Sequence, residues 1–244
     1  MKKIFFFIII TGLLSLYSCQ TDNKTAEKEV YQEVKKQEKP SLKKDITPEQ
    51  RKKLEELIQL LEDHPKSAKL YAERAGMFVE INEITQALQD ISMAVDLDPN
   101  NADYRTNRAQ LLRQFKKNKE ALEELNKALE INPKHLGALF NRGALYFNTN
   151  KFEKALADFS ACIEAQPNVA PPYFNRAFTY EQLHDFDKAK ADLKKFVTLT
   201  DNNEWKKLAQ DKITEWERVE YKTVVKPEDA AKMGIDTKGM GMHD

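Results

Sequence analysis

The sequence is poor in glycine and cysteine, and neither sign of charge is in excess. Only seven of the 244 residues are glycine, which argues against a β-rich domain. Two cysteines are too few for a disulfide framework. Lysine plus arginine and aspartate plus glutamate both total 39, so no overall field attracts nucleic acid or a membrane surface. The composition, 41% hydrophobic and 32% charged, instead suits soluble helices.

Residues that carry chemistry in enzymes are equally sparse. The four histidines lie in different predicted turns or in the C-terminal tail, without the spacing of metal ligands. They are His64, His135, His184 and His243. No glycine-rich phosphate loop, nucleophile elbow or zinc-binding helix motif occurs. We therefore predict a non-catalytic protein with no metal site and no cofactor, in which the first three histidines are exposed turn residues.

Small residues recur in this chain with a period of 34. Three sets of residues share this spacing. They are Ala75, Ala109, Gly143 and Ala177; Ala87, Ala121, Ala155 and Ala189; and Pro65, Pro99, Pro133 and Pro167. A small residue at a constant phase marks close contact between two helices. A period held without insertion predicts one helical hairpin stacked on copies of itself, an all-α solenoid.

Four full units begin at Ala68, Ala102, Leu136 and Ala170. In each, about fourteen residues of helix are expected, then a break, then a second helix. The second helix of the first three units ends at a proline, which lacks an amide donor, and that of the fourth ends at Thr200-Asp201. The breaks are predicted near Asn82, Lys116, Asn150 and His184.

These units resemble tetratricopeptide repeats, most closely at 141–159, NRGALYFNTNKFEKALADF. The resemblance covers 68–201 fully and 47–67 in part. It places the repeats at 68–101, 102–135, 136–169 and 170–203. It implies a right-handed superhelix of antiparallel helix pairs, whose first helices line a groove that binds peptides or partner proteins.

Non-repeat segments flank this array. Thr47, followed by Pro48, is the expected N-cap of a leading helix within 47–67. A capping helix is predicted over 204–221. Its apolar face is predicted to carry Trp205, Leu208, Ile213 and Trp216. The tail 222–244 has no period, so we expect disorder there and no metal site among its methionines and His243.

The N-terminus has the features of an export signal. Two lysines precede an apolar run over 4–17, which is short for a membrane span of roughly 17–25 residues. Leu16-Tyr17-Ser18-Cys19 then resembles the lipobox of bacterial lipoproteins. The resemblance implies that 1–18 is removed and that Cys19 carries acyl chains such as palmitate. Residues 19–46 would form a flexible tether. Gln20, where an inner-membrane protein commonly has aspartate, favours the outer membrane. An uncleaved N-terminal anchor is the alternative, and the membrane face stays open.

Two periodic features are predicted to be structural. Arg74, Arg108, Arg142 and Arg176 are each followed, 16 residues later, by Asp90, Glu124, Asp158 and Asp192. The matched period favours a bridge between the two helices over a row of anion-binding sites. Cys162 stands at the phase of Ala94 and Ala128, so a small buried side chain is expected rather than a reactive thiol.

The candidate partner site lies on the first helices. An asparagine precedes the arginine in three units: Asn107, Asn141 and Asn175. Amides that both donate and accept suit an extended peptide backbone. Phe140, Phe174 and Phe178 are candidate apolar anchors, with packing against neighbouring helices as the alternative. Family members that clamp a peptide's terminal carboxylate add basic residues here. Lys69 lies beside Glu73 instead, so that type of clamp is not expected.

The sequence thus predicts a lipid-anchored envelope protein that binds a protein or an extended peptide and acts as an adaptor or scaffold in a multiprotein complex. No nucleic-acid partner is expected. The alternatives are a self-associating structural envelope protein, or an accessory subunit of an envelope enzyme or a secretion machinery.

Overall fold

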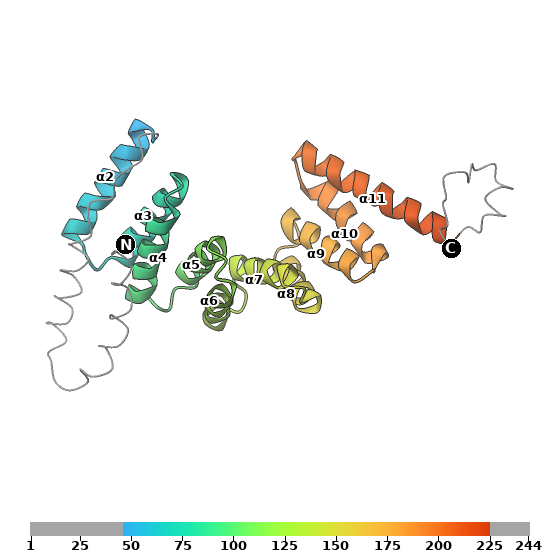
Figure 1. Ribbon diagram of the computed structural model, residues 1–244, viewed down its shortest axis with the longest axis horizontal. Helices are drawn as coiled ribbons and strands as arrows, with labels where there is room; N and C mark the ends of the chain where they lie inside the picture. Colours follow the sequence, from blue (N-terminus) through green and yellow to red (C-terminus); the bar gives the residue numbers. More distant parts are fainter. Residues whose placement is uncertain (1–45, 225–244) are drawn as a thin grey trace, which may run out of the picture. The chain divides into compact units, whose positions relative to one another are not determined.

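The computed structural model describes residues 46–224, where every regular element is helical (Figure 1). The helices are α2 (Pro48–Asp63), α3 (Ala68–Glu80), α4 (Ile84–Leu97), α5 (Ala102–Gln114), α6 (Asn118–Ile131), α7 (Leu136–Asn148), α8 (Phe152–Ala165), α9 (Ala170–Gln182), α10 (Phe186–Leu199) and α11 (Asn203–Val224). No strand occurs within 46–224, and the all-α prediction is confirmed. The chain divides into two compact units, residues 1–67 and 68–244.

Helix α2 is the described helix of the first unit. Its start is a capping box: the Gln50 amide donates to Thr47 Oγ1 (3.2 Å), and the Thr47 amide donates to Gln50 Oε1 (3.0 Å). Leu54, Leu57 and Leu61 form a buried stripe on one side of the helix. The predicted signal segment and the lipidation site Cys19 lie outside the described residues.

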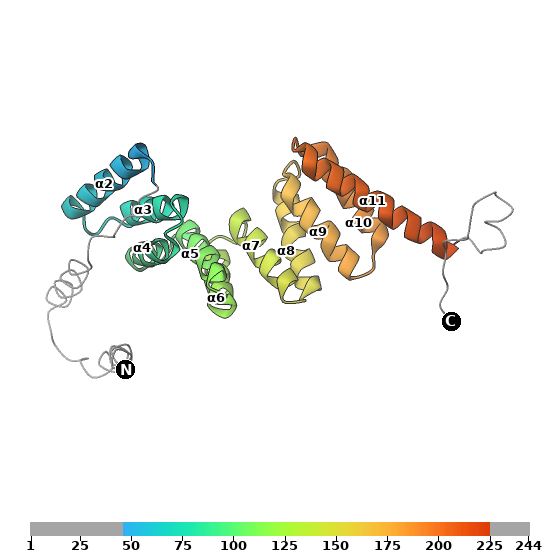
Figure 2. The ribbon, with the colours of Figure 1, turned by 45° about the horizontal axis from the view of Figure 1, so that its top comes forward.

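The second unit is a series of antiparallel helix pairs. Helix α3 packs on α4, α5 on α6, α7 on α8, and α9 on α10. Each pair also contacts the next, through α4 and α5, α6 and α7, and α8 and α9. The first helices touch one another as well, α5 with α7 and α7 with α9. Figures 1 and 2 both place consecutive helices of this unit side by side, ending with α11 along α10.

The break inside each hairpin has the same backbone conformation. The residues Asn82, Lys116, Asn150 and His184 have φ between 57° and 59°, and they lie 34 residues apart. In the first hairpin, the Glu83 amide donates to the Phe78 carbonyl (2.7 Å) and the Asn82 amide to the Val79 carbonyl (3.0 Å). This is the Schellman pattern, and the same two bonds recur in the other three hairpins. Glycine usually occupies this left-handed position, yet all four turns form without it.

The small residues of the period are buried between paired helices, as predicted. Ala109 and Ala177 are completely buried, and Gly143 is buried at the same phase. A Cβ atom on Gly143 would lie 2.8 Å from Cε1 of Phe159. The other units carry Ile91, Leu125 and Leu193 at the phase of Phe159. The larger ring therefore explains why glycine replaces alanine in this unit alone.

Helix α11 ends the array with a narrower apolar face than expected. Asn202 Oδ1 accepts from the amides of Glu204 and Trp205 (both 3.0 Å), which makes Asn202 the N-cap. The buried residues are Ala209, Ile213 and Trp216. Trp205 lies on this face, with its ring 5.1 Å from that of Phe174, but 46% of its surface is exposed. The prediction that Leu208 belongs to the face is wrong, because 49% of its surface is exposed. Burial follows a stripe with steps of four and three residues, and Leu208 lies off it.

Within 46–224, none of the helices combines the length and the apolar character needed to span a bilayer. The predicted tail 222–244 falls almost entirely beyond the described residues.

Candidate partner-binding face

The arginine row is bound to the second helices, as predicted. Arg74 donates from Nε and Nη2 to the two carboxylate oxygens of Asp90 (2.6 and 2.8 Å). The same two-bond pairing joins Arg142 to Asp158 (2.9 and 2.7 Å) and Arg176 to Asp192 (2.7 and 2.8 Å). Hydrogen bonding to their carboxylate partners raises the pKa of the Arg142 and Arg176 guanidinium groups.

These guanidinium groups also join successive units. The remaining Nη1 of Arg142 donates to Asn126 Oδ1 on α6 (3.0 Å), and Nη1 of Arg176 donates to Ser160 Oγ on α8 (3.0 Å). Each group thus bonds to its own hairpin and to the preceding one. With their nitrogens used internally, these arginines position helices.

The second repeat departs from this pattern, because one acid serves two arginines. Glu124 accepts from Arg108 Nη2 (2.7 Å) and from Arg105 Nη1 (3.0 Å), and Lys127 Nζ lies 3.7 Å away. Arg105 stands at the phase where the other units have a large apolar or aromatic residue, such as Leu139. This repeat therefore holds more positive than negative charge in its interior.

The three asparagines are not equivalent. Asn107 is exposed on α5. On α7, Asn141 is half-buried and accepts from Arg113 Nη1 through Oδ1 (3.3 Å). On α9, the Asn175 amide donates to the Pro171 carbonyl in its own helix (3.0 Å). We call the side of α5, α7 and α9 that carries these residues the asparagine face. Asn107 and Asn141 lie on two first helices that touch, and Asn175 is committed to its own helix.

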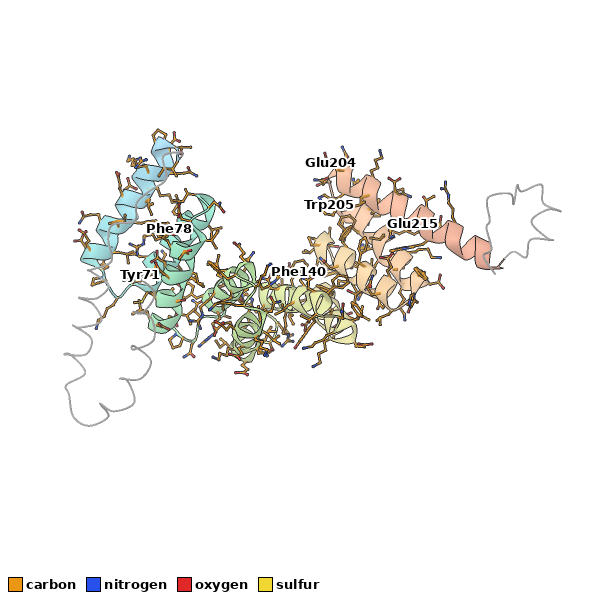
Figure 3. All side chains as sticks on the ribbon, viewed as in Figure 1. Tyr71, Phe78, Phe140, Glu204, Trp205 and Glu215 are labelled. Atoms are coloured by element: carbon orange, nitrogen blue, oxygen red, sulfur yellow. The ribbon has the colours of Figure 1, made fainter. Side chains whose placement is uncertain are left out.

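The candidate aromatic anchors are packed on other helices. The ring centroid of Phe140, which Figure 3 labels, lies 5.9 Å from that of Phe159. Phe174 lies at 4.9 Å from Phe196 and 5.1 Å from Trp205. Phe178 contacts Phe174 and Trp216, at 4.7 and 6.2 Å. All three candidates are half-buried, so each ring packs on the core with part of its surface open.

Sequence patterns missed Arg113, which lies in the last turn of α5. The residues at its phase are Val79, Arg113, Phe147 and Glu181, two apolar and two charged. Glu181 is bound by Lys212 Nζ (2.9 Å) and by Nε1 of Trp216 (3.0 Å). Among residues 68–199, all of which the structure describes, Arg113 alone of the arginines has no carboxylate partner. The change between apolar and charged residues at this repeat position was the available signal.

Family models match part of this sequence. The tetratricopeptide repeat models match residues 102–135, 137–169 and 170–203. Residues 102–203 contain tetratricopeptide repeats. The hairpin formed by α3 and α4 lies outside the matched residues, although it shares their turn and their arginine pair.

Solved tetratricopeptide structures have the same fold. The crystal structure of YrrB, described as a TPR protein with an unusual peptide-binding site, is 23% identical with a TM-score of 0.56, over 67% of this chain and 84% of that chain. A crystal structure of MamA is 18% identical with a TM-score of 0.56, over 64% and 95% of the two chains. MamA 41-end from Desulfovibrio magneticus RS-1 is 14% identical with a TM-score of 0.56, over 74% and 97%. Comparison with curated proteins finds no match.

Two other side chains in the repeats have structural roles. Cys162 is 2% exposed, and burial raises the pKa of its thiol to about 11, so the predicted packing role is confirmed.

The prediction that His135 is an exposed turn residue is wrong. Its Nδ1 accepts from the Ala138 amide (3.0 Å) and caps α7, while Nε2 lies 2.9 Å from Asp103 Oδ1. In the described part of the chain, no group of three acidic, histidine or cysteine side chains is arranged to hold a metal ion.

A recess of about 390 Å³ opens between α6 and α7. Its lining comprises Asn126, Leu129, Glu130, Pro133, Leu139 and Arg142. Two of its polar groups, Arg142 and Asn126, bond to each other, so the recess belongs to the contact between two repeats.

Proposed function

We propose that this protein is a non-catalytic adaptor or scaffold of the bacterial cell envelope that binds an extended segment of a partner protein on the asparagine face. Repeats of this type expose the same side of every first helix, and the peptide-binding site named for YrrB supports binding as their use. Within 68–199, the ionised groups of the paired arginines are engaged internally, which supports scaffolding over catalysis.

The observation that carries the proposal is the polar, mostly uncharged surface of α5 and α7. Asn107, Gln110 and Gln114 are exposed on α5, and Asn148 is exposed on α7. Carboxamides both donate and accept, so they match the alternating carbonyl and amide groups of an extended chain. A surface of this kind binds backbone at low electrostatic cost and needs few charged neighbours.

The test is capture of the partner from membranes with matched variants. We expect the double variant Asn107→Ala, Asn141→Ala to lose the proteins that co-purify with the wild type, while its helical content and thermal midpoint stay unchanged. The control is Lys119→Ala, Glu123→Ala, which removes two exposed side chains from the second helix α6. Retention of the same proteins by the asparagine variant would refute this site.

Envelope anchoring is the second part of the proposal. It rests on the lipobox-like residues before Cys19, and the outer membrane is the proposed location because Gln20 follows. Several acyl chains on one residue anchor a protein stably, whereas a single chain is marginal. Labelled palmitate should be incorporated by the wild type and not by Cys19→Ser. A wild type that takes up no label, with unchanged membrane retention of the variant, would exclude the lipid anchor.

Self-association is a second candidate, favoured by one observation. Trp205 and Leu208 expose nearly half of their surfaces on α11. Large apolar side chains that neighbour each other at the surface often mark contact sites. Light scattering coupled to size exclusion separates the two functions. A stable homo-oligomer that dissociates in Leu208→Glu supports the structural role, and a monomer supports the adaptor.

A further inference from the structure

Arg113 combines burial, charge and the lack of a countercharge. Its side chain is half-buried in the last turn of α5, and its one hydrogen bond to a side chain is the 3.3 Å bond from Nη1 to Asn141 Oδ1. The five other arginines of residues 68–199 all bind a carboxylate. Burial lowers the pKa of Arg113, and no acid opposes this effect.

Hydrogen-bond chemistry makes Arg113 and Asn141 a pair of donors. A guanidinium has no acceptor, so the Asn141 amide must turn its oxygen towards Arg113. Its Nδ2 group is then left to donate, and no described residue accepts from it. The remaining N–H groups of Arg113 are also donors. The pair therefore matches a ligand that offers two acceptor oxygens close together.

A role in the fold accounts for less of this arrangement. A cation in the last turn of a helix interacts favourably with the helix dipole, but an exposed lysine does so without desolvation. Asp103, the acid of α5, lies ten residues away, or about 15 Å along the helix, and contacts His135. At the same phase two units later, Glu181 of α9 receives a countercharge from Lys212 of α11. The charge at this repeat position is thus neutralised at Glu181 and not at Arg113.

We propose that Arg113 and Asn141 bind a carboxylate of the partner segment, supplied either by an internal aspartate or glutamate or by the segment's C-terminus. The inference rests on the proposed function and adds the charge class of the ligand. The site lies between α5 and α7, at a different phase from Lys69 and Glu73, where a basic clamp of the resembling family was considered. A carboxylate accepts two parallel bonds from a guanidinium, and Asn141 adds a third donor.

The experiment uses the full chain and two random dodecapeptide libraries on phage, one displaying internal segments and one displaying free C-termini. We expect selected peptides to share an acid at a constant position in the first library, or to require the free carboxylate in the second. Each acid is then replaced by its amide in a labelled synthetic peptide. Wild-type protein should prefer the acid by about tenfold, the size expected for one hydrogen-bonded charge pair.

Variants identify the responsible residue. Arg113→Gln should bind the acid and the amide with affinities within about twofold of each other, and Arg113→Lys should recover part of the preference. Lys119→Gln, which removes an exposed charge from α6, should keep the full preference. Because Arg113 has no acid partner in the fold, Arg113→Gln should keep the wild-type thermal midpoint.

The outcomes separate the two proposals. Selected peptides without an enriched acid, or an acid preference that survives Arg113→Gln, overturn the carboxylate site and leave peptide binding intact. If neither library yields a binder that competes with the captured partner, peptide binding on this face and the carboxylate site are both overturned.

Discussion

The middle of the repeat array and its C-terminal end differ in whether the charged residue at one repeat position has an oppositely charged partner. In the middle, Arg113 faces Asn141 of the next first helix and has no countercharge among residues 68–199. At the end, Glu181 is bound by Lys212 and Trp216 of α11. A terminal helix must cover the last hairpin, and its side chains satisfy groups that inner repeats leave open. This difference is the basis on which we propose a binding site in the middle of the array.

Aromatic packing follows the same division. In the middle, Phe140 contacts the single ring of Phe159. At the end, Phe174 and Phe178 pack against Phe196 and both tryptophans. Side chains of helix α11 therefore cover part of Phe174 and Phe178, two of the candidate anchors on α9, and Figure 3 shows Trp205 near the start of α11.

Truncating Trp216, the buried tryptophan of α11, should have the largest effect on stability. Trp216 is 3% exposed and packs on Phe178 and Phe186. We expect Trp216→Ala to lower the free energy of unfolding by about 3–5 kcal/mol, as for other buried aromatic truncations. Urea denaturation followed by circular dichroism measures this. Trp205→Ala, at a 46% exposed site, is the control and should cost clearly less. Equal losses would show that α11 does not cover α9 as described.

Removing one acid tests the paired arginines against Arg113. Asp158→Ala leaves the Arg142 guanidinium without its two-bond partner, and 23% of that side chain is exposed. We expect a loss of about 3 kcal/mol in urea denaturation, at the lower end for a broken buried pair. Glu153→Ala, an exposed acid in the first turn of α8, should cost less than about 1 kcal/mol. A loss for Asp158→Ala no larger than this control would contradict the bridging role.

Adding one methyl group at position 143 tests why the third unit has glycine where the other units have alanine. Gly143→Ala should destabilise by about 1–3 kcal/mol, because the new Cβ meets the Phe159 ring at 2.8 Å. In a Phe159→Leu background the same change should stabilise by up to about 1 kcal/mol, since alanine is the better helix former. Gly76→Ala, where a Cβ meets nothing within 4 Å, is the control and should also stabilise. A loss at position 143 that persists beside Leu would point to a cause other than the ring.

The smallest effect concerns pH at the C-terminal end. The hydrogen bond to Glu181 raises the pKa of Lys212 above its ordinary 10.5. The folded state then holds this proton more tightly, so the stabilisation is complete below 10.5 and is lost as the pH rises through the folded-state pKa. The difference in thermal midpoint between wild type and Lys212→Met should shrink above that pH. Lys194→Met, at an exposed pair, is the matched control. A difference that stays constant with pH would show that the charge of Lys212 does not contribute to stability.

Much of the fold could be predicted because repeats constrain it several times over. The period of 34 predicted the hairpins, the buried alanines and the bonds from Arg142 and Arg176 to their acids. These depend on residues 16 or fewer positions apart in one hairpin. Predictions that depended on one surface were weaker. Trp205 and Leu208 shared an apolar pattern with Trp216, but only tertiary packing could select the residues that α11 buries.

The candidate site divides in the same way. The sequence by itself determined the repeated hairpin and the phase of Asn107 and Asn141, because local helix geometry and nearest-neighbour contacts repeat with the sequence. Tertiary structure alone decided that Arg113 meets Asn141, that Glu181 meets Lys212, and that Phe174 packs on Trp205. These contacts join different repeats or the terminal helix. The partner of a side chain at such a contact depends on which residue of the next helix lies opposite it. The 34-residue period by itself does not show which residue that is.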